Sequence, residues 1–101
     1  MQASFDIVIV GGGVVGLTLA VALAEATKLS IAVIDAANAP TWEKNKYSPR
    51  VSAITLASKR ILQKLNVWPV IIEKRASAFT RIQVWNHGEV SRTLSFDSED
   101  I

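Results

Sequence analysis

The chain has 101 residues, 50% of them hydrophobic, and this length predicts a single domain that is just large enough to bury a core. Its 11 basic and 9 acidic residues are interspersed and give a net charge of +2, so the charge pattern provides no reason to expect nucleic-acid binding. The absence of cysteine excludes disulfides and thiolate metal sites, and it fits a reducing compartment.

The first expected element is a strand over residues 5–10, a short apolar run rich in β-branched side chains. Gly11, Gly13 and Gly16 follow with the spacing of the dinucleotide-binding fingerprint, and residues 14–26 should form a helix that is apolar nearly all round. In that fingerprint the first glycine makes a tight turn, the second lets backbone approach a pyrophosphate, and the third lets helix pack on strand. Phosphates are favoured there because a helix N-terminus presents unpaired N–H groups and the positive end of its dipole.

The same region has a competing interpretation as an export signal or membrane span, because residues 7–24 carry no charge. A signal peptide requires a basic leader and an uninterrupted apolar centre, yet residues 1–5 hold no Lys or Arg and the apolar run contains four glycines. A transmembrane helix does not favour three consecutive glycines near its start. We therefore expect a cytoplasmic protein.

A second strand is expected over residues 30–34, with Asp35 at its carboxyl end. The order strand, glycine turn, helix, strand predicts a parallel βαβ unit with a right-handed crossover. An acid at this distance from the glycines accepts hydrogen bonds from the ribose hydroxyl pair of a dinucleotide and would repel a 2′-phosphate. Asp is also common in strand-end turns, so the ribose role depends on the glycines and Asp35 occurring together.

Residues 36–49 have no apolar period and are expected to form a solvated loop. An amphipathic helix is expected over residues 55–66, closed by Asn66, which tolerates positive φ. A shorter apolar helical piece over residues 67–72 follows it.

From residue 80 the apolar period changes to two, which predicts a β-hairpin whose turn contains His87 and Gly88. A single His in such a turn is expected to be exposed, with no catalytic role and no metal site. The three tryptophans, Trp42, Trp68 and Trp85, are expected to be packing residues and not a stacking platform.

These residues support a resemblance to a known family. The glycine turn with Asp35 resembles the N-terminal FAD fingerprint of the p-hydroxybenzoate-hydroxylase-like flavoprotein monooxygenases. The segment Arg-Val-Ser-Ala-Ile-Thr-Leu-Ala-Ser at residues 50–58, with Trp68 and the later Val-Trp pair at residues 84–85, is similar to the ubiquinone-biosynthesis hydroxylase branch. The similarity runs from about residue 6 to 96, and it departs from the family pattern at Asn66 and Asn86, where a glycine and an acid are usual.

The resemblance implies an α/β, Rossmann-like βαβ FAD/NAD(P)-binding fold, present as its N-terminal portion with an added β-hairpin. Residues 1–101 would be a partial FAD-binding domain, inactive alone and weak in retaining FAD, with the remainder of the enzyme absent. The full enzyme would hydroxylate the aromatic ring of a polyprenylated phenol, using FAD, NAD(P)H and oxygen, and it could lie at the periphery of the inner membrane. Uncovered faces of the fragment would promote self-association.

By the same resemblance the glycine segment holds the pyrophosphate, Asp35 holds the adenosine ribose, and Arg50 reaches the flavin or the phosphates. The alternative for Arg50 is a solvated surface arginine. The residues expected to bind the cofactor are Gly11, Gly12, Gly13, Val14, Val15, Gly16, Asp35, Ala36 and Arg50. No catalytic or metal-binding residue is assigned.

Three other functions remain open at this point. An NAD-dependent dehydrogenase or a flavin amine oxidase shares the first βαβ unit, although the segment at residues 50–54 argues against both. A non-catalytic nucleotide-binding module is the third.

Overall fold

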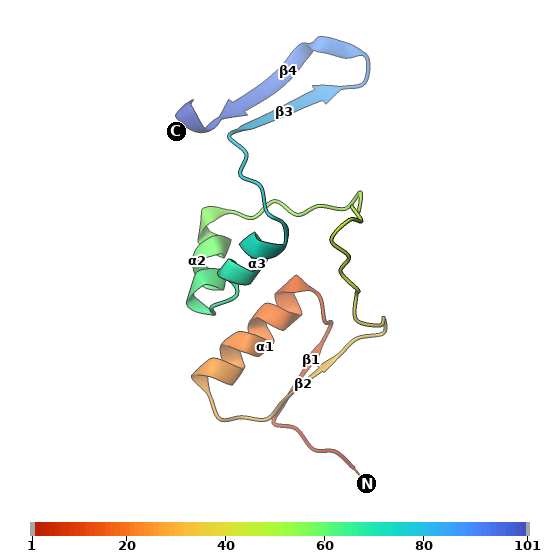
Figure 1. Cartoon of the computed structure of the whole chain (residues 1–101), viewed down its shortest axis with the longest axis vertical. Coiled ribbons are helices and arrows are strands. Elements are labelled where there is room, and N and C mark those ends of the chain that lie inside the picture. The colour runs from red at the N-terminus through yellow and green to blue at the C-terminus, as the bar shows by residue number, and fades with distance from the viewer. Residues whose placement is uncertain (1, 101) are drawn as a thin grey trace.

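The computed structural model describes residues 2–100, and the side chains of all of these except residues 89–92 and 100. A helix connects two short parallel strands and lies beside them, two further helices follow a long loop, and a hairpin follows these helices (Figure 1). The elements are β1 (Ile7–Val10), α1 (Val14–Ala26), β2 (Ile31–Ile34), α2 (Leu56–Lys64), α3 (Trp68–Arg75), β3 (Arg81–Asn86), β4 (Glu89–Asp97) and the 3₁₀ turn η1 (Ser98–Asp100).

The expected βαβ unit is present. Strands β1 and β2 pair in parallel, with Ile7 opposite Ile31, and α1 packs against both strands. The two strands are also joined where they begin, because the Asp6 carboxylate accepts hydrogen bonds from the Ser30 N–H at 2.8 Å and the Ser30 hydroxyl at 2.9 Å. These bonds hold the pKa of Asp6 below its ordinary value of 3.8, and the bond from the Ser30 backbone has the larger effect.

Helix α1 covers the residues that the sequence predicts. It ends where the Thr27 N–H and the Thr27 hydroxyl both donate to the carbonyl oxygen of Leu23, at 2.9 and 2.7 Å. Its apolar surface is largely uncovered, since Leu17 and Leu19 are each about half exposed. Within residues 2–100, no helix is both long enough and apolar enough to cross a membrane.

Helices α2 and α3 pack as a pair, and Leu62 of α2 is buried. The Thr55 hydroxyl caps α2 by accepting from the Ser58 N–H at 3.2 Å. Asn66 adopts a φ of 59° and so closes the helix as predicted. Helix α3 is longer than the apolar run at residues 67–72 indicated, because it continues through Glu-Lys-Arg to Arg75, residue types that form exposed helix readily.

The hairpin also forms as predicted. Strands β3 and β4 pair antiparallel, with an irregular register between Val84 and Asn86, and Gly88 takes a φ of 86° in the turn. An ion pair of 2.9 Å between Arg81 and Asp97 closes the open end. All six residues of β3 are exposed, so the apolar face of the hairpin is uncovered.

The expectation of a buried core is wrong for the described chain. Its accessible surface is 9496 Å², whereas a compact protein of this mass exposes about 5,600 Å². Its radius of gyration is 18.5 Å, against about 13 Å for a compact chain of similar length. Ile9 and Leu62 are the buried apolar residues among those described. Few residues are buried because the elements follow one another along the long axis of an elongated molecule of 64 × 28 × 26 Å (Figure 1).

Candidate functional site

The glycine turn joins the end of β1 to the start of α1, beside the end of β2. Gly11 has a φ of 110°, a conformation that side chains disfavour, and its N–H donates to the carbonyl oxygen of Ile34 at 2.7 Å. That bond places the turn at the carboxyl end of both parallel strands, where ligands bind in open α/β sheets.

Gly16 sets how closely α1 approaches this turn. A Cβ atom built on Gly16 would overlap the carbonyl oxygen of Gly11 and lie 3.4 Å from Cγ2 of Ile9. No other residue type fits without moving the helix away from β1. This is the close helix–strand approach that the third glycine of the motif is expected to provide.

Gly13 is the N-cap of α1 and differs from Gly16, because nothing lies within 4 Å of a Cβ built on it. No side chain caps the helix, and its first turn carries no acid. Among the described hydrogen bonds, none uses the N–H groups of Val14, Val15 or Gly16 as donors. An anion placed at this end would meet free N–H groups, a favourable dipole and no obstructing side chain.

Asp35 lies directly beside the turn. Its Oδ2 accepts from the Gly12 N–H at 2.7 Å and its Oδ1 accepts from the Ala37 N–H at 2.8 Å. These two hydrogen bonds hold the pKa of Asp35 below its ordinary value of 3.8, and the bond from Ala37 has the larger effect, followed by the bond from Gly12. The group is therefore a carboxylate at neutral pH. Each oxygen keeps acceptor capacity for a further donor such as a ribose hydroxyl.

Ala36 lies between Asp35 and Ala37 in this bend, with an exposed side chain. An open pocket of about 200 Å³ adjoins this bend at Asp35 and Ala37, and its volume is smaller than that of the usual site for a whole cofactor. The residues that line the pocket are Gly12, Leu17, Asp35, Ala37, Asn38, Ala39 and Pro40. Sequence reasoning missed Leu17 and the segment 37–40; the available signal was that Leu17 follows the motif directly and that 37–40 follow the acid.

Arg50 is not among the residues that line this pocket. Its N–H donates to the Ser48 hydroxyl at 3.1 Å, and its guanidinium group has no hydrogen bond to the described part of the chain. The structure therefore brings the glycine turn and Asp35 together and leaves Arg50 in the exposed loop. Its expected contact with a cofactor stays a prediction.

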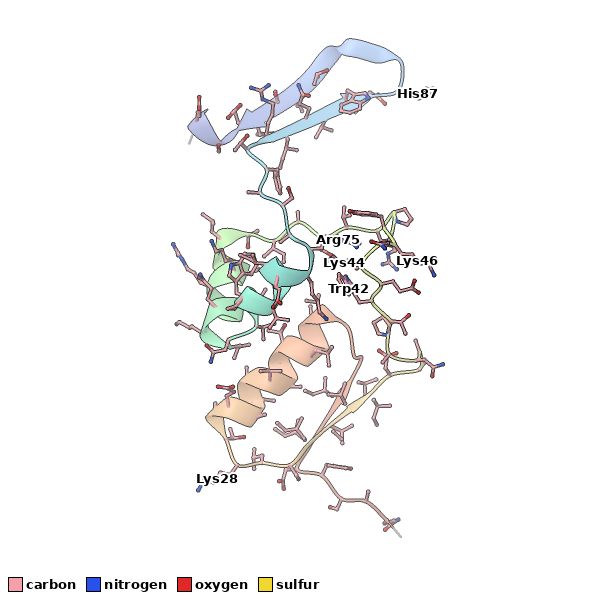
Figure 2. All side chains as sticks on the ribbon, in the orientation of Figure 1. Lys28, Trp42, Lys44, Lys46, Arg75 and His87 are labelled. Atoms are coloured by element: carbon pink, nitrogen blue, oxygen red, sulfur yellow. The ribbon has the colours of Figure 1, made fainter. Side chains whose placement is uncertain are left out.

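The remaining candidate residues lie elsewhere. His87 is exposed at the tip of the hairpin, as predicted (Figure 2). No group of three or more His, Asp or Glu in the described residues could hold a metal ion. Trp42 and Trp85 are not the packing residues that were expected, since they are 47% and 62% exposed, whereas Trp68 is partly buried. The Trp42 ring lies 5.5 Å from the guanidinium of Arg75.

The chain is similar in sequence to known proteins over most of its length. The model of the family described as FAD dependent oxidoreductase matches residues 6–66, which include the turn, Asp35 and Arg50. A ubiquinone biosynthesis monooxygenase, mitochondrial COQ6 of Rattus norvegicus, is 38% identical over 96% of this chain and 21% of its own length. The ubiquinone hydroxylase UbiL of Rhodospirillum rubrum is 44% identical over 65% of this chain and 15% of its own length.

A third relative is the 3-demethoxyubiquinol 3-hydroxylase of Escherichia coli, 37% identical over 79% of this chain and 20% of its own length. The chain thus spans about a fifth of the length of the curated relatives that it matches over most of its residues.

Proposed function

Because this chain belongs to the FAD-dependent oxidoreductase family, we propose that it is the N-terminal part of the FAD-binding domain of a monooxygenase that hydroxylates the aromatic ring of a polyprenylated phenol in ubiquinone biosynthesis. The observation that carries the proposal is the contact between the Asp35 carboxylate and the Gly12 N–H, at the uncapped start of α1. This contact supports the proposal because a dinucleotide requires a ribose acceptor beside its pyrophosphate site.

In this proposal the pyrophosphate of FAD lies at the N–H groups of Val14, Val15 and Gly16, and Gly13 leaves it room. Asp35 accepts hydrogen bonds from the adenosine ribose, with the pocket at residues 37–40 on its outer side. The bound flavin supplies the redox and oxygen chemistry, and these residues bind and orient it.

We further propose the reductant of the whole enzyme, its location and the role of Arg50. NAD(P)H is the reductant, Arg50 reaches the flavin or the phosphates, and the whole enzyme is peripheral to the membrane that holds its lipid-tailed substrate. Residues 1–101 form part of one FAD-binding domain, so segments outside this chain cover α1 and the hairpin; produced alone, the chain self-associates through these faces. The uncovered apolar surface supports the statements on covering segments and self-association, and the relatives' names support the lipid-tailed substrate.

The test uses the full-length gene product with Gly13→Val and Asp35→Ala, measuring bound flavin by absorbance and reaction with a polyprenylated phenol by product analysis. The wild type should purify yellow and form a hydroxylated product, and both variants should lose flavin while staying folded. Glu25→Ala, which removes an exposed acid near the other end of α1, is the matched control and should keep its flavin. A folded but colourless wild-type protein would refute the proposal, and flavin without phenol hydroxylation would favour the amine oxidase alternative.

A further inference from the structure

Arg75, the last residue of α3, reaches across to the loop that follows Asp35 (Figure 2). Its Nη1 donates to the carbonyl oxygen of Lys46 at 2.6 Å, and its Nη2 donates to those of Lys44 at 2.5 Å and Glu43 at 3.3 Å. Its Cζ atom also lies 4.1 Å from the ring centre of Tyr47. One side chain therefore contacts four of the five residues at positions 43–47.

The loop is shaped to receive this group. The Lys46 N–H donates to the carbonyl oxygen of Glu43 at 3.2 Å, which makes a tight turn, and the two side chains form an ion pair of 3.0 Å. The turn directs several carbonyl oxygens toward one point, and a planar guanidinium with five N–H donors can satisfy them together. A lysine ammonium could not also stack on the Tyr47 ring in this way.

The contacted turn, residues 43–47, lies midway in sequence between the pocket segment 37–40 and Arg50. On one side, Pro40 is the last residue that lines the pocket, and it precedes Trp42, the residue before the turn, by two positions. On the other side, Arg50 follows Tyr47, the last residue of the turn, by three positions. A chain of three residues spans at most about 11 Å, so a fixed Tyr47 confines Arg50 to a small region. Without Arg75, the chain between Asp35 and Thr55 would have few contacts to hold it, and long unstructured loops are costly to order on binding.

We propose that Arg75 is a positioning residue for the cofactor site, which acts by holding residues 43–47 against the end of α3. It thereby orders the pocket wall at residues 37–40 and confines Arg50 before FAD binds. The inference rests on the proposed function, because FAD is the ligand whose affinity would depend on that order. Arg75 itself touches neither Asp35 nor the glycine turn among the described contacts.

The test compares Arg75→Ala and Arg75→Lys with Lys74→Ala in the full-length protein. Lys74 is the matched control, because its ammonium lies 5.5 Å from the Trp42 ring while the described side-chain bonds to the carbonyls of residues 43–46 come from Arg75. Amide hydrogen exchange of residues 37–50 is measured on flavin-free protein, and FAD affinity is measured by fluorescence titration.

For Arg75→Ala we expect faster exchange in residues 37–50, unchanged exchange in α1, and FAD binding about tenfold weaker, since ordering the loop then costs binding free energy. Arg75→Lys should fall between Arg75→Ala and the wild type, and Lys74→Ala should match the wild type. Faster exchange with unchanged FAD affinity would overturn the positioning role, and unchanged exchange would overturn the loop contact itself. If the wild type bound no FAD, the proposed function would fail, and the exchange data would still decide whether Arg75 orders the loop.

Should Arg75→Ala not fold, Tyr47→Ala provides a second test, since it removes the ring under the guanidinium and leaves the helix intact. It should speed exchange in the same residues and weaken FAD binding less than tenfold. An unchanged affinity together with faster exchange would again contradict the proposal.

Discussion

The βαβ unit at residues 6–35 and the loop with helices at residues 36–75 form the two described sides of the candidate site, and different forces hold them. In the first, backbone groups meet directly: the Gly11 N–H binds the Ile34 carbonyl, and α1 lies so close that Gly16 has no room for a side chain. In the second, an exposed arginine holds an exposed turn, and among the described residues of α2 and α3 one leucine is buried.

This difference predicts how each side responds to change. Contact between backbone groups cannot relax around an added atom, so the first side should fail abruptly on a small substitution. Exposed side-chain contacts are weakened by salt and by competing water, so the second side should lose order gradually.

The largest effect is expected for Gly16→Ala. The added methyl group would overlap the Gly11 carbonyl oxygen and force α1 away from β1, which should lower the free energy of unfolding by about 3 kcal/mol. Gly13→Ala is the control, because its Cβ meets open space; exchanging one N-cap residue should cost at most about 1 kcal/mol. Urea unfolding of both flavin-free proteins measures the two values, and equal losses would contradict the direct backbone contact.

Leu62→Ala tests the packing of the second side. Leu62 of α2 is 8% exposed, and its truncation should cost about 2 kcal/mol, the low end for leucine because no other described residue of α2 or α3 is buried. The neighbouring Ile61 is 52% exposed, so Ile61→Ala should cost clearly less in the same urea titration. A larger loss for Ile61→Ala would mean that another part of the protein covers that face of α2.

The pH dependence of stability should come from the first side. Asp6 and Asp35 have pKa values lowered by hydrogen bonds in the folded state, so their contribution is present above pH 3.8 and is lost as pH falls through the lowered values. Thermal midpoints measured between pH 7 and pH 2.5 should therefore drop at the acid end. Asp6→Asn and Asp35→Asn should each make that drop smaller; an unchanged profile in both would refute the assignment.

The smallest effect is expected at the end of α2. Asn66 has a φ of 59°, which glycine adopts without strain, so Asn66→Gly should change the free energy of unfolding by no more than about 0.5 kcal/mol. Asn66→Ala should lower it by about 1 kcal/mol, because alanine is disfavoured in the left-handed region. Thermal unfolding of the two variants side by side checks this order.

The elements that sequence reasoning predicted well are those with a local signal. The glycine spacing, the apolar run of α1, the Asn at the end of α2 and the His-Gly turn each act through the conformation of a few adjacent residues. The surroundings of Trp42 and the contacts of Arg75 could not be predicted in this way, because they join segments about thirty positions apart that no local pattern marks. The end of α3 differs, since the Glu-Lys-Arg that extends this helix has a local helix propensity that the apolar run did not indicate.

The amino-acid sequence alone determined the βαβ unit, its turn and the acid at the end of its second strand, because backbone geometry and strand pairing follow from neighbouring residue types. Only the tertiary structure decided that the Asp35 carboxylate binds the Gly12 N–H, that Gly16 is closed to side chains while Gly13 is open, and that Arg75 holds the following loop. These are distances between atoms from different elements, and packing sets them.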